Sequence, residues 1–252
     1  MVVKDVYFAY FMLALTAMAG LLYAVRLAVR GAARSERVSR IGGTALIGQE
    51  VMDWTYWAVE PIVKGCVALG ITANGATWIA LVLGLGAGVA VGFGWFGLAC
   101  LLAAWSVLFD ILDGQIARFT NTGSNAGEVL DAATDRYTEF AFVGGAVFLF
   151  RENTWALGLS MGALLACFMV SYASAKAEAM GVEVPRGLMR RHERATYMIT
   201  GAGLTAMVGP YLHDHVPGLP ATTFMLGGLA IVAAIGNIAA VVRLVRIGRA
   251  LR

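Results

Sequence analysis

Four aspartates in an otherwise apolar part of the chain are the residues best suited to chemistry. They are Asp110, Asp113, Asp131 and Asp135. The first two stand at i and i+3 and the last two at i and i+4, so on helices each pair would lie on one face. Carboxylates are costly inside a membrane protein and usually mark a functional pathway or a metal site. Two such faces meeting could enclose Mg²⁺ or a similar hard cation, which takes oxygen ligands and keeps substrate phosphates in its shell.

The composition predicts that these aspartates belong to an integral membrane protein. Hydrophobic residues make up 59% of the 252 residues, charged residues only 14%, and the mean hydropathy is +0.73. A soluble domain would carry more charge. Apolar runs long enough to cross a bilayer predict seven spans, near residues 6–25, 75–94, 95–117, 128–150, 155–175, 195–212 and 222–242.

The basic residues predict how these spans are oriented. Lys and Arg are retained on the cytoplasmic side of short loops. When the chain is threaded through seven spans, all of its 19 basic residues except Lys4 and Arg151 fall on one side. We therefore expect the N-terminus outside the cell (inner) membrane, and the C-terminus and the four aspartates at its cytoplasmic face.

The sequence around the aspartates resembles the signature of the CDP-alcohol phosphotransferase family, D-x2-D-G-x2-A-R-x8-G-x3-D-x3-D. Its fixed positions are filled here by the four aspartates together with Gly114, Ala117, Arg118 and Gly127. The resemblance implies an enzyme that moves a phosphate-linked group from a CDP-linked donor, commonly CDP-diacylglycerol, to the hydroxyl of a polar alcohol, with release of CMP.

The resemblance also implies a cofactor of two Mg²⁺ or Mn²⁺ ions in each active site. Asp110 and Asp131 would bridge both ions, and Asp113 would hold one of them. Asp135 would ligate the other ion and accept the proton of the acceptor hydroxyl. Asp135 can serve as this base only if its free oxygen reaches the incoming hydroxyl.

A donor site follows from the same resemblance. Its residues would be Thr72, Asn74, Asp113, Gly114, Ala117, Arg118, Ser124 and Gly127. The stretch G-I-T-A-N-G-A-T from Gly70 to Thr77 resembles a family element beside the nucleotide, although Ala73 stands where proline is usual. Two alternatives stay open: Thr72 and Asn74 could cap a helix that begins there, and Arg118 could be a cytoplasmic anchor rather than a planar fork for phosphate.

The segment S-Y-A-S-A-K-A-E-A, with the run R-R-H-E-R that follows it, resembles the corresponding part of prokaryotic phosphatidylinositol-phosphate synthases. The resemblance places Lys176, Arg191 and Arg194 in the acceptor site and favours an inositol phosphate, whose dianion suits arginine. Ser174 stands where those enzymes have a lysine. Another acceptor, such as the glycerol 3-phosphate used by a phosphatidylglycerophosphate synthase, is therefore the alternative, and the basic cluster could also be a membrane anchor.

The predicted fold is an all-α integral membrane protein. Residues 1–40 are expected to form an extra N-terminal transmembrane helix and a basic linker, and residues 41–252 the family's membrane domain with six core helices. Within 46–66, Trp54 and Trp57 stand among charged residues, which predicts an amphipathic juxtamembrane helix. The resemblance implies a homodimer embedded in membrane lipid, and no nucleic acid is expected as a partner.

Two other classes of function explain the sequence less well. An ion-coupled transporter would use the aspartates to line an ion path, but it would leave the matches at Gly114, Ala117, Arg118 and Gly127 unexplained. Internal repeats typical of transporters are not evident. A catalytically silent relative is disfavoured because all four aspartates are intact.

Overall fold

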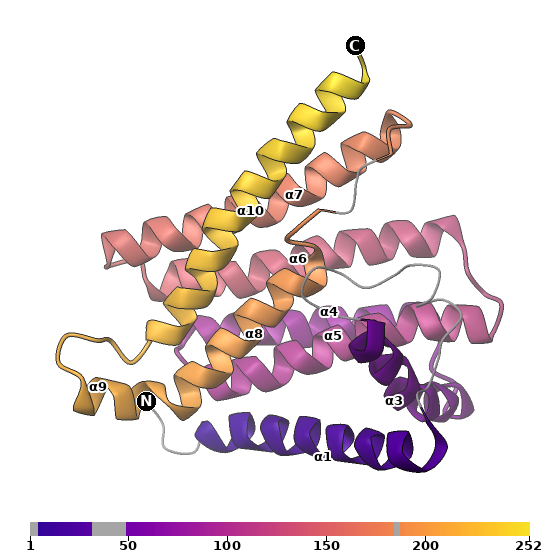
Figure 1. Cartoon of the computed structure of the whole chain (residues 1–252), viewed down its shortest axis with the longest axis horizontal. Coiled ribbons are helices and arrows are strands. Elements are labelled where there is room, and N and C mark those ends of the chain that lie inside the picture. The colour runs from indigo at the N-terminus through magenta and orange to yellow at the C-terminus, as the bar shows by residue number, and fades with distance from the viewer. Residues whose placement is uncertain (1–4, 32–48, 184–186) are drawn as a thin grey trace.

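The computed structural model describes residues 5–31, 49–183 and 187–252, and these residues form helices without any strand. The helices are α1 (Val6–Arg30), α3 (Gln49–Ala68), α4 (Ala73–Gly92), α5 (Phe96–Phe119), α6 (Asn125–Leu149), α7 (Thr154–Ala179), α8 (Arg191–Met207), α9 (Gly209–His215) and α10 (Thr223–Ala250) (Figure 1). The predicted all-α class is confirmed. The expected boundary between residues 40 and 41 lies outside the described residues, as do Lys4, Arg34, Arg37, Arg40 and Arg186 of the charge argument.

Five of the described helices are long and apolar enough to cross a membrane: α1, α4, α5, α7 and α10. The chain is therefore a multi-pass membrane protein. The spans expected near 128–150 and 195–212 are present as α6 and α8, but both fall short of this measure. Asp135, Arg136 and Glu139 interrupt the apolar part of α6. Helix α8 has only 17 residues, and it is followed by the separate short helix α9, which has Pro210 in its first turn.

Glycines allow α4 and α6 to approach closely. A Cβ on Gly88 would collide with the carbonyl oxygen of Ala141, and one on Gly145 would collide with that of Gly88. Small residues at helix contacts are typical of membrane proteins, in which close backbone approach replaces the hydrophobic effect as the source of association. Gly84 likewise lies against the Thr138 side chain of α6, where a Cβ would collide with it.

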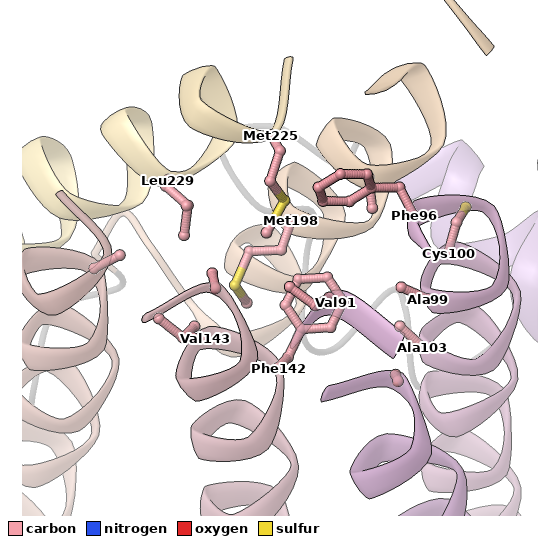
Figure 2. Packing of buried hydrophobic residues seen from close by; sticks show 14 of the residues in the cluster. Val91, Phe96, Ala99, Cys100, Ala103, Phe142, Val143, Met198, Met225 and Leu229 are labelled. Atoms are coloured by element: carbon pink, nitrogen blue, oxygen red, sulfur yellow. The ribbon is translucent and has the colours of Figure 1, made fainter. Parts of the chain in front are cut away.

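The core lies toward the end of the bundle away from the aspartates. Val91 of α4, Phe96 of α5, Val143 of α6, Met198 of α8 and Leu229 of α10 meet there and are buried (Figure 2). The same cluster includes Ala9 of α1 and Ala163 of α7, so seven of the described helices share it, which fixes their relative positions.

The extra N-terminal helix α1 is attached to the core by a polar contact. Asp5, 5% exposed, accepts hydrogen bonds from the backbone N–H groups of Gly97 (2.8 Å) and Leu98 (2.9 Å) in the first turn of α5. The N-cap residue of α5, Trp95, makes no side-chain cap of its own. Asp5 therefore supplies, from a distant part of the chain, the acceptor that a helix N-terminus needs.

The predicted juxtamembrane helix is present as α3, and it lies between α1 and α5. On one side, the Trp54 indole N–H donates to the carbonyl of Ala19 (3.2 Å), and the Tyr23 and Trp57 rings lie 5.5 Å apart. On the other side, apolar residues of α3 pack against Leu112 and Ile116 of α5. Helix α3 thus supports the turn of α5 that carries the first aspartate pair.

Candidate active site

Three of the four predicted aspartates meet at one end of the bundle. One carboxylate oxygen from each of Asp110, Asp113 and Asp131 lies within 4.8 Å of the others. The Thr77 hydroxyl of α4 donates to Asp113 Oδ2 at 2.7 Å, which fixes that carboxylate. Asp131 Oδ1 is buried and has no hydrogen-bond partner among the described residues. Carboxylate oxygens with an unsatisfied member are the ligand set that Mg²⁺ or Mn²⁺ prefers, so these residues fit the expected cation.

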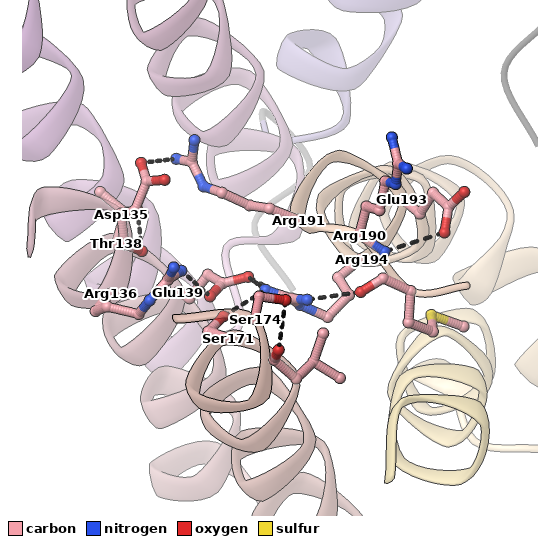
Figure 3. A network of polar contacts seen from close by, with 12 residues as sticks. Asp135, Arg136, Thr138, Glu139, Ser171, Ser174, Arg190, Arg191, Glu193 and Arg194 are labelled. Carbon is pink, nitrogen blue, oxygen red and sulfur yellow. Dashed lines mark hydrogen bonds and ion pairs between the residues drawn. The ribbon is translucent and has the colours of Figure 1, made fainter. Parts of the chain in front are cut away.

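The fourth aspartate lies one turn further along α6 and has a different environment. Arg191 of α8 reaches between Asp110 and Asp135, with Nη1 2.6 Å from Asp110 Oδ2 and Nη2 2.7 Å from Asp135 Oδ1. Figure 3 shows the contact with Asp135. A single guanidinium therefore joins the two aspartate pairs.

An open cleft of about 530 Å³ is lined by Asp113 and Asp131, whereas Arg191 is not among the residues that line it. Every residue predicted for the donor site except Thr72 lines it: Asn74, Asp113, Gly114, Ala117, Arg118, Ser124 and Gly127. These residues come from α4, α5, α6 and the loop between α5 and α6, so the structure brings together what the sequence scatters over more than fifty positions.

Two helices begin at this cleft, each with a capped first turn. The Thr72 hydroxyl accepts the N–H of Gly75 (3.1 Å) at the start of α4, and the Ser124 hydroxyl accepts that of Gly127 (3.1 Å) at the start of α6. The capping alternative for Thr72 is therefore confirmed. The positive ends of the two helix dipoles favour an anion at this position.

The three cations predicted for the acceptor site lie in three different environments. Arg191 contacts the aspartates and is 26% exposed. Lys176 is exposed near the C-terminal end of α7. Arg194 is 1% exposed, and its Nε donates to Glu139 Oε1 (2.9 Å) while its Nη1 donates to the carbonyl of Met189 (2.7 Å) (Figure 3).

The structure adds two residues that sequence reasoning missed. Arg243 of α10 is 7% exposed and donates from Nη1 to Ser174 Oγ (2.9 Å) and from Nη2 to the carbonyl of Leu188 (2.8 Å). A buried guanidinium therefore lies beside the serine that replaces the family's lysine. The other residue is Glu139, the partner of Arg194. The signal for both was a charge within a helix of a membrane protein, because such charges are usually functional. Glu139 follows Asp135 and Arg136 in α6, and Arg243 precedes Arg246 and Arg249 in α10.

Comparison with known proteins agrees with this geometry. The sequence profile of the CDP-alcohol phosphatidyltransferase family matches residues 70–247. The phosphatidylinositol phosphate synthase of Corynebacterium glutamicum is 34% identical over 163 residues, which cover 62% of this chain and 74% of that protein. The enzyme of the same description from Mycobacterium tuberculosis H37Rv is 32% identical over 184 residues, covering 69% and 80%.

Solved structures resemble the chain as well. A crystal structure of the Mycobacterium tuberculosis phosphatidylinositol phosphate synthase in complex with manganese and citrate has a TM-score of 0.64 and 26% identity, covering 74% of this chain and 87% of that chain. A structure of that enzyme with CDP-DAG bound has a TM-score of 0.63 and covers 74% and 92%. Since the matched segment spans most of the chain and contains all four aspartates, this protein belongs to the CDP-alcohol phosphatidyltransferase family of metal-dependent membrane enzymes.

Proposed function

We propose that this protein transfers the phosphatidyl group of CDP-diacylglycerol to an inositol phosphate and releases CMP. The observation that carries the proposal is the aspartate cluster, which lines an open cleft through Asp113 and Asp131 and is contacted at Asp110 by Arg191. A donor anion and a phosphorylated acceptor could then reach the same carboxylates from two sides. Relatives described as phosphatidylinositol phosphate synthases support this choice of substrates.

The cleft is the proposed donor site. Gly114 and Gly127 have no Cβ and let the nucleotide approach the backbone. Arg118 offers a planar fork to a phosphate, and Asn74 and Ser124 contribute hydrogen-bonding groups beside the helix N-termini. Ala117, which has a small side chain, also lines the cleft. Thr72 acts on this site by capping α4, the helix that carries Asn74.

Two Mg²⁺ or Mn²⁺ ions are the proposed cofactor. Asp110 and Asp131 would bridge them, with Asp113 on one ion and Asp135 on the other. When bound, such a pair offsets charge on the diphosphate and stabilises the attacking and leaving oxygens. Asp113 is kept in place by Thr77. Asp135 accepts the proton of the acceptor hydroxyl, because it lies on the side of Arg191, where the acceptor would be held.

The acceptor site is proposed around Arg191, with Lys176 and Arg194 as the other basic members predicted from the sequence. An inositol phosphate carries a dianion, and arginine forks bind such groups with directional, charge-assisted hydrogen bonds. Arg243 beside Ser174 adds a guanidinium where the family's lysine is missing. Glycerol 3-phosphate is the second candidate, because a phosphate is all that these cations require.

We also propose an orientation and an assembly. The N-terminus lies outside the cell membrane, residues 1–40 form an extension, residues 41–252 form the enzyme domain, and the active site faces the cytoplasm. The charge distribution supports the orientation. A cysteine at position 121 should resist an impermeant reagent in intact cells, whereas one at position 214 should react. Labelling at position 121 would overturn the cytoplasmic site.

The proposed assembly is a homodimer with one active site in each protomer. Mixing an inactive Asp135→Asn chain with wild type should leave activity proportional to the wild-type fraction. A steep, dominant loss would mean that the two chains share a site.

The substrate proposal is tested with purified protein, radiolabelled CDP-diacylglycerol and a panel of alcohols. We expect CMP release and lipid product with an inositol phosphate first, glycerol 3-phosphate second, and free inositol or serine behind them. A preference for an alcohol without phosphate would refute the acceptor. No CMP release with any alcohol in saturating Mg²⁺ or Mn²⁺ would refute the proposed reaction.

A further inference from the structure

Two ion pairs connect α6 and α8, one turn apart on each helix. Asp135 and Arg191 form the outer pair, and Glu139 and Arg194 form the inner one (Figure 3). Asp135 and Glu139 are separated by four positions, and Arg191 and Arg194 by three, so each helix presents its two charges on one face. The outer pair reaches the aspartate cluster, whereas Glu139 is 7% and Arg194 1% exposed.

Both residues of the inner pair make further polar contacts. Besides Glu139, Arg194 donates to the carbonyl of Met189 (2.7 Å) and to Ser171 Oγ of α7 (3.3 Å). The second oxygen of Glu139 accepts from Arg136 Nη1 (3.2 Å). A buried guanidinium that lost this carboxylate would be left as an uncompensated charge, which is strongly unfavourable. Arg194 therefore has its hydrogen bonds committed within the bundle rather than available to a ligand.

The same arginine holds the turn from which Arg191 starts. Met189 is buried and has φ 61°, a left-handed conformation that is unfavourable for a residue with a side chain. Arg194 Nη1 binds the carbonyl of Met189, and the N–H of Arg190 donates to Glu193 Oε2 (3.1 Å). The first residues of α8 are thus fixed from within the helix, and Arg191 lies directly among them.

We infer that Glu139 and Arg194 are positioning residues that hold Arg191 between Asp110 and Asp135, and that Arg194 acts on the acceptor through Arg191 rather than by touching it. This inference rests on the proposed function, because it assigns the acceptor contact to Arg191. The inference assigns different roles to Arg191 and Arg194, which the sequence places in one basic cluster.

The two roles of Arg194 predict opposite results for Glu139→Gln. If Arg194 touched the acceptor phosphate, weakening its partner would free the guanidinium, and the KM for the acceptor would fall or stay the same. If Glu139 and Arg194 position Arg191, the KM for the acceptor rises, because the guanidinium is no longer held in line with the aspartates. The KM for the donor should change little, since neither Glu139 nor Arg191 lines the cleft.

The experiment measures both KM values and kcat for wild type, Glu139→Gln, Arg191→Ala and the double variant. For Glu139→Gln we expect the acceptor KM to rise roughly tenfold, the effect of one coupled interaction, and the donor KM to stay within about twofold. In the Arg191→Ala background the same change should have no further effect on the acceptor KM. Glu152→Gln is the matched control, because this glutamate pairs with Arg151 but is 85% exposed and remote from the site.

Either of two outcomes overturns the inference: an unchanged or lowered acceptor KM in Glu139→Gln, or effects of Glu139→Gln and Arg191→Ala that multiply. Should Glu139→Gln fail to fold, Glu139→Gln/Arg194→Met carries the test, since removing both buried charges is tolerated better than removing one. Its acceptor KM should be raised as well, and an unchanged value would overturn the inference.

The behaviour of wild type distinguishes a failure of the proposed function from a failure of this inference. If wild type used another alcohol, the same comparison would be made with that alcohol. If wild type released no CMP, thermal unfolding of the four proteins would still measure the coupling of Glu139 to Arg191. A non-additive shift in Tm supports positioning through α8, and strict additivity contradicts it.

Discussion

The donor half and the acceptor half of the site differ in how open they are and in how many arginines they hold in contacts with other protein groups. The donor half is open, its cleft is lined by two helix N-termini, and Asp131 Oδ1 has no partner among the described residues. In the acceptor half, Arg191, Arg194 and Arg243 are all engaged with protein groups. A diphosphate can therefore enter an open cleft, whereas an acceptor must exchange existing contacts of Arg191 for new ones.

Because of this difference, we expect substitutions in the donor half to affect mainly catalysis and substitutions in the inner acceptor half to affect mainly stability. Groups in the donor half do little to hold the fold, because they face a cleft. Groups in the inner acceptor half hold α6, α7 and α8 together, because they are buried and cross between helices. Substitutions in the two halves should therefore fail in different assays.

The largest effect is expected from neutralising the aspartates. Asp110→Asn, Asp131→Asn and Asp135→Asn should each lower kcat by more than about 100-fold, beyond the loss typical of residues that only support a metal ligand. The folded protein should survive Asp131→Asn in particular, since that change relieves repulsion among clustered carboxylates. Activity assays with Mg²⁺, with Mn²⁺ and after chelation, alongside thermal unfolding, measure both effects. Exposed Asp214→Asn is the control, and near-wild-type turnover of any of the three would contradict the two-metal site.

The reverse pattern is expected for Arg194. Arg194→Ala removes the buried partner of Glu139, which keeps only its contact with Arg136, and the free energy of unfolding should fall by about 3 kcal/mol, as for other broken buried pairs. Removing both charges in Glu139→Gln/Arg194→Met should recover much of this loss. Denaturation in detergent measures the two variants. Equal stability of Arg194→Ala and wild type would mean that the inner pair does not hold the helices.

A smaller effect is expected from Asp5, which lies outside both halves. Asp5→Ala removes the cap of α5 and should lower stability by about 1 kcal/mol, whereas Asn, which also caps helices, should lose less. The two KM values should not move, because the contact is at the opposite end of α5 from Asp110. A raised donor KM in this variant would show that α1 acts on the active site itself.

The smallest effect tests the donor half alone. Thr72→Ala removes the cap of α4 and should lower stability by roughly 0.5–1 kcal/mol. If capping is its whole contribution, the donor KM stays unchanged and Thr72→Ser restores wild-type stability. A donor KM that rises without loss of stability would instead assign Thr72 a nucleotide contact.

How much the sequence predicts also differs between the two halves. The donor half depends on spacing within α5 and α6 and on two helix starts, and local patterns specify such features. The spacing of Asn74, Arg118, Ser124 and Gly127 therefore predicts that they share one site, and all four line the cleft.

The acceptor half depends on pairs that only tertiary packing creates. Glu139 meets Arg194 across 55 positions and Ser174 meets Arg243 across 69. Nothing in the local sequence says which of Arg191 and Arg194 faces the aspartates, because both belong to one basic run. The C-terminal end of α8 was also predicted wrongly. The predicted span runs to residue 212, whereas α8 ends at Met207 and the separate helix α9 begins at Gly209, next to Pro210.

The contact of Asp5 with α5 also constrains the order of assembly in the membrane. Its partners, Gly97 and Leu98, are 92 and 93 positions further along the chain, so α1 is synthesised long before the helix that it caps. Until then α1 must persist in lipid without this contact, which its largely unburied apolar surface permits. Attachment through Asp5 is therefore a late step, and a ribosome-bound chain that ends before residue 97 should hold α1 through its contacts with α3 alone.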